Sequence, residues 1–241
     1  MKHAYLIVMV AVVLGLGLAV LAGPSVMAND KDKDGPKVID RDSVAYGRTY
    51  GDWMAAWDQW ALSIPVANHP LFDNGDCSVG QSGPVWFLGG NFVPPSTRVR
   101  HCIVPSGTAL FFPVVDWEDS TLEESVAEHP GDPTYQEING LRSFVDSGLS
   151  GVTNQFCMLD NRPIRDLVQD FRIRSTVFGI TIPDDNLWTA AYGVNFPAGT
   201  YFPSVDDGWD VLLAPLPPGD HVLHFGSNWN DITYYLHVSA K

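Results

Sequence analysis

The chain has 241 residues, with 14 basic and 28 acidic side chains and a formal net charge of −14 at pH 7. This acidic excess excludes nucleic acid and anionic lipid as expected partners, because both are bound through clustered lysine and arginine. The length suits one large domain, and all-β domains of this size are ordinary.

The N-terminal segment has the features of a secretory signal peptide. Lys2 and His3 precede an apolar run over residues 4–22, and small residues stand just before Asn29, where a signal peptidase would cut. Removal of residues 1–28 leaves 13 basic and 28 acidic side chains, a net charge of −15. The apolar run of about 19 residues is also long enough to remain as a membrane anchor. We therefore expect a secreted or periplasmic protein, or one anchored by this segment and facing outward, which meets a membrane only if the segment stays.

Residues 29–41 are charged and lack apolar periodicity, which predicts a flexible lead. Asp30, Asp32 and Asp34 form the first half of a calcium-loop pattern. The twelfth position of that pattern, where a calcium loop needs an acid, is Arg41. A solvated lead is the expected state.

A single folded domain is expected over residues 42–241, beginning with an aromatic helix. Asp42 or Ser43 is the expected N-cap, and Pro65 ends the helix. At about 100° per residue, six apolar side chains share one arc of the helix. They are Tyr46, Tyr50, Trp53, Trp57, Trp60 and Ile64.

This aromatic stripe has two interpretations. It is either a core face that covers the sheet or a ledge on which planar ligands such as sugars stack. Its continuity with Ile64 favours the core. Asp58 and Leu62 fall on the far side of the helix.

After the helix, the pattern becomes one of short strands separated by turns that contain glycine and proline. The expected strands are 84–92, 99–104, 108–115, 171–182, 201–205, 209–215, 220–225 and 232–238. Residues 121–128 and 134–147 have a helical or loop-like pattern. Together these elements predict a mainly β fold, a β-sandwich or jelly roll of antiparallel sheets with an N-terminal aromatic, amphipathic helix and a small helical insertion.

Several segments of the chain resemble a group of exported bacterial proteins of uncharacterised function. The segments are the aromatic helix, DCSVGQSGPVWFLGG, RHCIVPSGTALFFPVV and DGWDVLLAPLPPGDHVLHFGS with DITYYLHV. The resemblance covers most of residues 46–239. It implies export and a single β-rich domain, and it carries no known activity and no catalytic residues.

Three cysteines, Cys77, Cys102 and Cys157, lie in the expected mature chain. An oxidising compartment predicts one disulfide and one remaining thiol. The pair Cys77–Cys102 is favoured because it closes the shorter loop. Sequence alone leaves the other pairings open.

Two acidic groups stand at the ends of apolar strands. Asp116, Glu118 and Asp119 follow one strand, and Asp116 and Glu118 share a face if that strand continues. Asp206 and Asp207 lead a second group that ends at Asp210. Each group suits a general acid/base pair or a hard-cation site, and each equally suits a solvated turn.

The weak catalytic candidates from these groups are Asp116, Glu118 and Asp207. The expected ligand-binding residues are Asp119, Asp206 and Trp209.

The C-terminal hairpin carries His221, His224 and His237. A five-residue loop over 227–231 would place His221 opposite His237. Two such rings are weak candidates for a transition-metal site, although surface histidines without a metal are the expected state. No cofactor is firmly implied, and calcium or a transition metal stays an open alternative.

Several catalytic motifs are absent from the sequence. It contains no G-x-S-x-G, H-E-x-x-H, P-loop or dinucleotide fingerprint. The first expectation is therefore a secreted, non-catalytic module that binds an extracellular glycan, polymer or protein through loops near 116–120 and 205–209. Two alternatives are a carboxylate-dependent hydrolase or lyase of such polymers and a structural or surface-assembly protein. Two carboxyl groups with raised pKa in one cleft would favour the enzyme.

Overall fold

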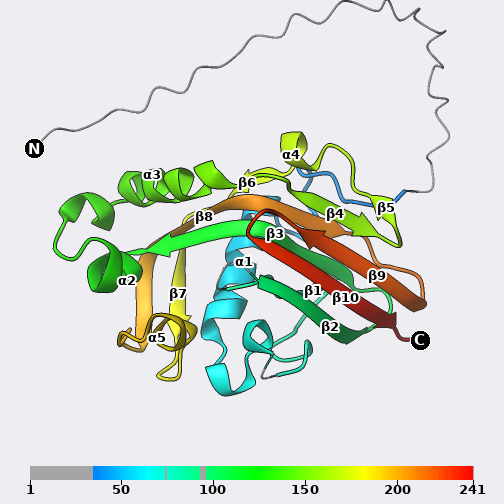
Figure 1. Cartoon of the computed structure of the whole chain (residues 1–241), viewed down its shortest axis with the longest axis horizontal. Helices are drawn as coiled ribbons and strands as arrows, with labels where there is room; N and C mark the ends of the chain where they lie inside the picture. Colours follow the sequence, from blue (N-terminus) through cyan, green and yellow to red (C-terminus); the bar gives the residue numbers. More distant parts are fainter. Residues whose placement is uncertain (1–34, 74, 93–95, 241) are drawn as a thin grey trace, which may run out of the picture. The chain divides into compact units, whose positions relative to one another are not determined.

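The computed structural model describes residues 35–73, 75–92 and 96–240. The predicted signal peptide or anchor and the acids of the lead, Asp30, Asp32 and Asp34, lie outside these residues. The described chain is mainly β and contains two mixed five-stranded sheets with several helices (Figure 1). A mainly β fold is thus confirmed, whereas the sheets are mixed rather than purely antiparallel.

The first sheet is centred on a long antiparallel pair, β3 with β8. Its strands are β1 (Val85–Phe87), β3 (Ala109–Ser120), β6 (Arg172–Arg174), β7 (Phe178–Ile182) and β8 (Gly199–Leu213). β1 pairs in parallel with the start of β3 only as far as Phe111, and β6 and β7 pair with the other edge of β8. Within the described chain, the edge of β3 beyond Phe111 is therefore open.

The second sheet has the order β2-β10-β9-β4-β5. Its strands are β2 (Ser96–Val104), β4 (Phe156–Leu159), β5 (Arg162–Pro163), β9 (Gly219–Gly226) and β10 (Asn230–Val238). β10 is antiparallel to β9 and parallel to β2. Successive side chains of a strand point to opposite faces, and alternate residues of β10 are buried, which gives this sheet one inward face.

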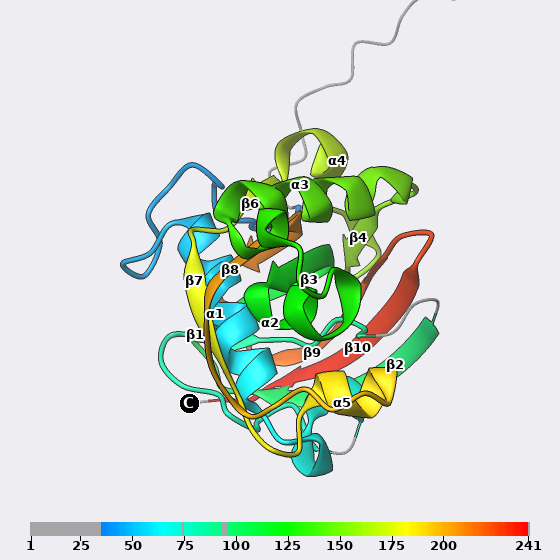
Figure 2. The same ribbon diagram turned by 90° about the vertical axis from the view of Figure 1, so that its left-hand side faces the viewer.

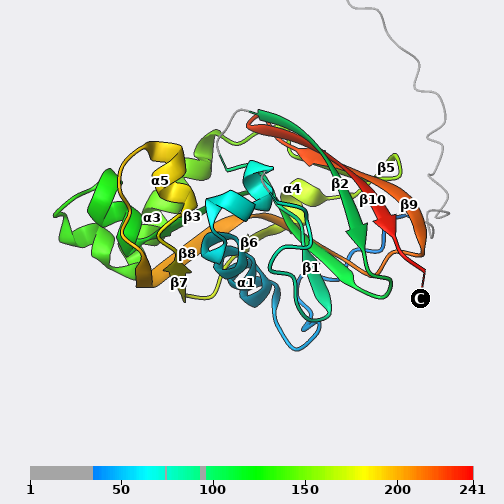
Figure 3. The same cartoon turned by 90° about the horizontal axis from the view of Figure 1, so that it is seen from below.

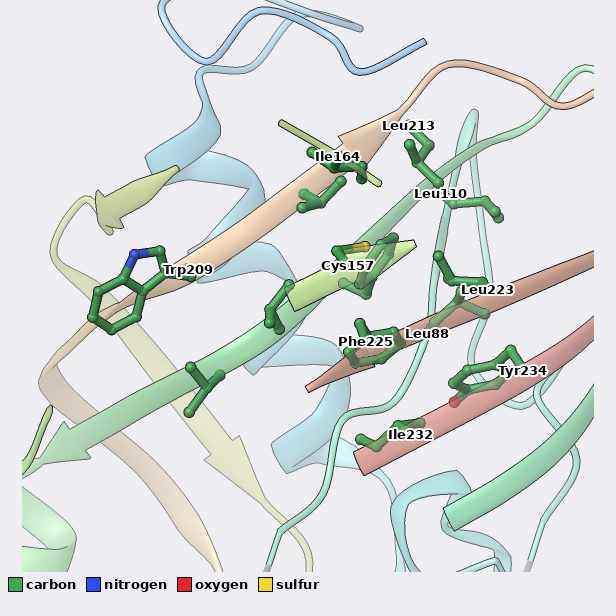
Figure 4. Close-up of a cluster of buried hydrophobic side chains, with 14 of the residues drawn as sticks. Leu88, Leu110, Cys157, Ile164, Trp209, Leu213, Leu223, Phe225, Ile232 and Tyr234 are labelled. Carbon is green, nitrogen blue, oxygen red and sulfur yellow. The ribbon is translucent and has the colours of Figure 1, made fainter. Parts of the chain in front are cut away.

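The two sheets share a hydrophobic core. Phe112 of β3 and Phe225 of β9 lie with their ring centroids 4.7 Å apart. Figure 4 shows Leu110 and Leu213 of the first sheet near Leu223 of the second. Burial of such side chains removes apolar area from water, the main favourable term in folding.

Helices and short helical turns fill the remaining positions. The helices are α1 (Tyr50–Ser63), α2 (Thr121–Glu123), α3 (Ile138–Gly148), α4 (Leu167–Asp170) and α5 (Leu187–Tyr192). The turns are η1 (Val66–Asn68), η2 (Pro70–Phe72), η3 (Glu124–Glu128), η4 (Pro133–Gln136) and η5 (Leu149–Gly151). α1 covers one face of the first sheet, and α3 and the second sheet pack on the other (Figure 3).

The aromatic helix begins later than the sequence predicts. A capping box formed by Thr49 and Asp52 starts α1, so the predicted N-caps Asp42 and Ser43 are wrong. Tyr46 lies before the helix with φ +53° and an exposed fraction of 42%. The backbone hydrogen bonds between Ala45 and Arg48, at 2.9 and 3.1 Å, hold Tyr46 in a tight turn that a helix cannot contain.

The other five residues of the stripe pack in one cluster with the first sheet, which confirms the core interpretation. They are Tyr50, Trp53, Trp57, Trp60 and Ile64. The far side of α1 is buried as well: Leu62 packs in a second cluster with Leu187 and Trp188, and Asp58 is only 2% exposed. Two buried sides distinguish α1 from an amphipathic surface helix.

The strand predictions are correct in position but differ in length. The predicted strands 201–205 and 209–215 are one strand, β8, so the segment SVDDG is not a turn. The predicted strand 171–182 divides into β6 and β7. The sequence did not predict β4, which has four residues, at the lower limit of what periodicity detects, or β5, which has only two.

Candidate ligand site

A cavity of about 240 Å³ lies along the open edge of β3. α1, α2 and α5 stand around this end of β3 (Figure 2). Six acidic residues line the cavity, and they are Asp58, Asp116, Glu118, Asp119, Glu123 and Glu128. Aromatic residues form much of the remaining wall, including Trp117, Phe144, Trp188, Tyr192, Phe196 and Trp229. The described lining contains no lysine, arginine or histidine.

The β3–β8 ladder brings the two predicted acidic groups together. Asp116 pairs with Gly208, and Glu118 pairs with Asp206. Strand alternation directs Asp116 and Glu118 to one face of the sheet, as predicted, and Asp206 and Asp210 to the same face. These acids lie in strands rather than in the predicted loops, and α1 brings Asp58 to the same place.

Gly208 allows the two strands to approach closely beside the acids. A Cβ atom at this position would lie 2.6 Å from Cα and 2.7 Å from Cβ of Asp116. Real Cβ atoms do not approach other heavy atoms so closely, so any side chain at 208 would displace Asp116. The glycine that suggested a turn in the sequence is needed here for packing.

Asp58, Asp116 and Asp206 form a compact trio. One carboxylate oxygen of each lies within 4.8 Å of the others. Neither carboxylate oxygen of Asp206, nor Oδ2 of Asp58, has a hydrogen-bond partner at normal geometry, and the closest polar neighbours of the Asp206 carboxyl include the Asp58 carboxyl itself. Burial raises the pKa of Asp116 to about 7. Burial first, and neighbouring carboxylates second, raise the pKa of Asp58 and Asp206 well above the ordinary value.

The acids of the adjoining wall are also largely buried. Ser204 donates a hydrogen bond of 2.5 Å to Glu118, and the Ser120 hydroxyl donates to Glu123. Burial raises the pKa of Glu123 to about 7. Burial and contact with Glu124 raise the pKa of Asp119 to about 10. This wall therefore holds carboxyl groups that keep a proton near neutral pH.

Asp207 and Trp209 lie on the opposite face of β8. Asp207 pairs with Arg172 at 2.9 Å and with Arg174 at 3.0 Å. Trp209 is buried, and its Nε1 donates to the Val168 carbonyl at 3.1 Å. Neither residue lines the cavity, although the sequence grouped both with Asp206.

The predicted pairing of His221 with His237 is wrong. His221 lies opposite Leu236, and His237 lies opposite Asp220. Ser227 and Asn230 close a loop one residue shorter than predicted, with a backbone hydrogen bond of 2.9 Å. This one-residue change of register places the two histidines on opposite faces of the sheet.

Both ring nitrogens of His221 already have partners. Nδ1 lies 2.7 Å from Asp160, and Nε2 lies 2.9 Å from the Pro217 carbonyl oxygen. His237 contacts Asp220 at 2.6 Å. The hairpin histidines thus face carboxylates and a carbonyl, separately from one another.

The cysteine pairing is as predicted. Cys77 and Cys102 form a disulfide, with their Cα atoms 5.7 Å apart, and Cys157 is a buried free thiol. A disulfide is consistent with an extracellular or periplasmic location. No helix in the described ranges is long and apolar enough to cross a membrane.

Comparisons with known proteins give no family for this chain. No protein-family profile and no curated protein matches its sequence. One solved structure, "Structure of PbICP-C in complex with falcipain-2", aligns with 65% of this chain and 100% of its own at 11% identity. The TM-score is 0.24, so this similarity carries no argument about fold or function.

Three of the six cavity acids, Asp58, Glu123 and Glu128, were not predicted as site residues from the sequence. Asp58 lies among aromatic and alanine residues in the middle of α1, and an acid at such an interior position of a buried helix is the signal that could have indicated it. Glu123 follows β3 after Ser120, whose side chain also caps α2. The S-x-x-E spacing there matches a capping box, so the sequence by itself assigns Glu123 to helix capping and not to a cavity wall.

Proposed function

We propose that this protein is an exported binding protein for a small organic cation, held in the acidic and aromatic cavity. One observation carries the proposal: six acidic residues line the cavity, and no basic side chain is among the described lining residues. A buried carboxylate without a counter-charge is costly. A cationic ligand would supply that counter-charge.

The aromatic wall supports a ligand with an apolar body next to its charge. Trp117 lies 6.1 Å from Phe144 and 5.8 Å from Trp229, measured between ring centroids. On α5, Trp188 lies 6.1 Å from Tyr192. The faces of such rings attract cations, most strongly where water is excluded. Amines, quaternary ammonium compounds and amino sugars share this chemistry.

Proton release should accompany binding of such a cation. Burial holds the pKa of Glu123 at about 7, so this carboxyl is partly protonated at neutral pH. An approaching cation favours the ionised form and lowers that pKa. The affinity should therefore increase as pH rises from 6 to 8, by up to about tenfold for one group.

The test compares matched cationic and neutral ligands by calorimetry. Choline, glucosamine and benzylamine should bind, whereas 3,3-dimethylbutanol, glucose and benzyl alcohol should bind far more weakly. Glu123→Gln should weaken cation binding about tenfold, the effect of losing one charge–charge contact in a protein interior. Glu137→Gln, at an exposed position, is the matched control. Equal affinity for the neutral ligands would contradict the proposal.

A second candidate is a carboxylate-dependent hydrolase or lyase of extracellular polymers. Asp116 and Glu123 line the same cavity, and the pKa of each is about 7. A carboxyl group with a pKa in this range suits general acid catalysis near neutral pH, which favours this candidate. Release of soluble products from a glycan or cell-wall polymer would support this candidate. Such release should disappear in Glu123→Gln while the variant stays folded.

A further inference from the structure

We propose that Asp58, Asp116 and Asp206 form a binding site for a hard divalent cation, with Ca²⁺ as the preferred ion. The three residues come from α1, β3 and β8, so the site exists only in the folded chain. This inference goes beyond the proposed function, because it assigns a metal ion to three carboxylates, two of which, Asp58 and Asp116, also belong to the acidic lining of the cavity.

The geometry of the trio suits a single ion. One oxygen of each carboxylate lies within 4.8 Å of the other two. Two ligands of one Ca²⁺ ion stand at most about 5 Å apart, because each bond is about 2.3–2.6 Å long. The three oxygens can therefore coordinate one ion without a change in backbone position.

The hydrogen-bonding of Asp206 provides the second observation. Asp206 is fully buried, and neither of its carboxylate oxygens has a hydrogen-bond partner at normal geometry, although the Asp58 carboxyl and the Asp207 N–H lie nearby. Buried polar atoms in proteins nearly always have partners, so two such oxygens on one side chain indicate a missing ligand. Oδ2 of Asp58 points to the same conclusion, since it also lacks a donor and its residue is 2% exposed.

The nearby arginines do not neutralise the trio. Arg142 donates to the backbone carbonyl of Asp206 at 2.8 Å, not to its carboxylate. Arg172 and Arg174 pair with Asp207, on the other face of β8. On the inner face, β8 also carries buried Asp210, whose Oδ2 lacks a donor. A divalent cation would balance this charge.

The ligand atoms identify the class of metal. All three are carboxylate oxygens, which suit Ca²⁺, Mg²⁺ and Mn²⁺ rather than Zn²⁺ or Cu²⁺. Ca²⁺ tolerates irregular coordination, whereas Mg²⁺ requires a near-ideal octahedron and loses its waters reluctantly. Asp58 and Asp116 also line the cavity, so water can complete the coordination from that side.

The test measures Ca²⁺ binding to the exported protein after treatment with EDTA. Calorimetry gives the affinity directly. Tb³⁺, a luminescent substitute for Ca²⁺, should be sensitised by Trp57 beside Asp58, and Ca²⁺ should quench that signal by displacement. Mg²⁺ should bind more weakly than Ca²⁺.

Asp206→Asn preserves the shape of the side chain and removes one charged ligand. It should lower Ca²⁺ affinity at least about tenfold and abolish the rise in melting temperature that Ca²⁺ produces. Asp58→Asn should do the same and serves if the first variant fails to fold. Asp207→Asn, one residue along on the opposite face, is the matched control and should retain Ca²⁺ affinity.

Two results would overturn the proposal: no Ca²⁺ binding by the native protein, or unchanged affinity in both Asp206→Asn and Asp58→Asn. Binding of choline and benzylamine is measured separately, with Glu123→Gln as its variant. Loss of one kind of binding with retention of the other therefore distinguishes failure of the metal site from failure of the proposed function.

Discussion

Glu123 lies in the cavity wall, and its carboxyl group is removed from bulk water. Because of this burial, the free energy of unfolding depends on the protonation state of Glu123. Burial raises its pKa from 4.5 to about 7. In the unfolded chain the group loses its proton near pH 4.5, whereas the folded chain keeps it up to about pH 7. The folded state therefore binds more protons across this window, and the free energy of unfolding falls as pH rises.

We predict that the EDTA-treated protein loses thermal stability between pH 4.5 and 8, and that Glu123→Gln reduces this loss. The amide cannot ionise, so its burial cost does not change with pH. Melting temperatures at half-unit pH steps measure the effect. Glu137→Gln should retain the native slope, and an equal slope in both variants would show that Glu123 does not carry the effect.

Gly208 provides a second prediction at the scale of single residues. Gly208→Ala places a methyl group against the backbone of Asp116 and should lower the free energy of unfolding by about 1–3 kcal/mol. It should also weaken Ca²⁺ binding, because it shifts one ligand. Gly151→Ala, where a Cβ meets nothing within 4 Å, should change stability by less than about 0.5 kcal/mol in urea denaturation.

At the scale of elements, α1 serves both the core and the cavity. Trp57 is 6% exposed, packs against the first sheet, and also lines the cavity. Its Nε1 donates to the Leu88 carbonyl at 2.9 Å. One side chain thus anchors the helix and forms part of the candidate ligand site.

Trp57→Ala should lower the free energy of unfolding by about 3–5 kcal/mol, the usual cost of truncating a large core side chain. Trp57→Phe keeps an aromatic ring and loses the hydrogen bond, so it should cost less. Chemical denaturation measures both variants. If Trp57→Ala unfolds like the native protein and loses only ligand binding, the residue belongs to a binding platform rather than to the core.

The local sequence pattern predicted the positions of the helices and strands better than it predicted which of them pack or pair together. Continuation of the strand past Val115 indicated that Asp116 and Glu118 share a face, and strand positions were largely correct. The union of residues 199–213 into one strand could not be predicted, because two aspartates before a glycine favour a turn unless a neighbouring strand needs that glycine. The predicted pairing of His221 with His237 was wrong because the loop between the two strands is one residue shorter than expected.

Helical periodicity has a similar limit for Asp58. It identifies the stripe that packs on the sheet, but it does not show whether a second element covers the other side. In this protein α5, together with Leu122 and β7, covers that side, and these residues lie far from α1 in the sequence. The composition of the cavity therefore follows from tertiary packing that one helix does not encode.

At the scale of the whole molecule, the free cysteine and the two disulfide-bonded cysteines should differ in their reaction with alkylating reagents. Cys157 is 2% exposed, and burial raises its thiol pKa above the ordinary value. We predict that iodoacetamide leaves Cys157 unmodified in the native protein and labels it after denaturation, because only the exposed thiolate reacts readily. Mass spectrometry without reductant should also recover Cys77 joined to Cys102. Three labelled cysteines after denaturation alone would contradict the disulfide.

The place of β10 has a consequence for the order of assembly. This strand follows all other described strands in sequence, yet it lies between β2 and β9 in the middle of its sheet. Until residues 230–238 are available, β2 has no neighbour to pair with and β9 lacks one of its two ladders. A chain that emerges from its N-terminus would therefore complete this sheet only after its last described strand has emerged, whereas every strand of the first sheet is available earlier.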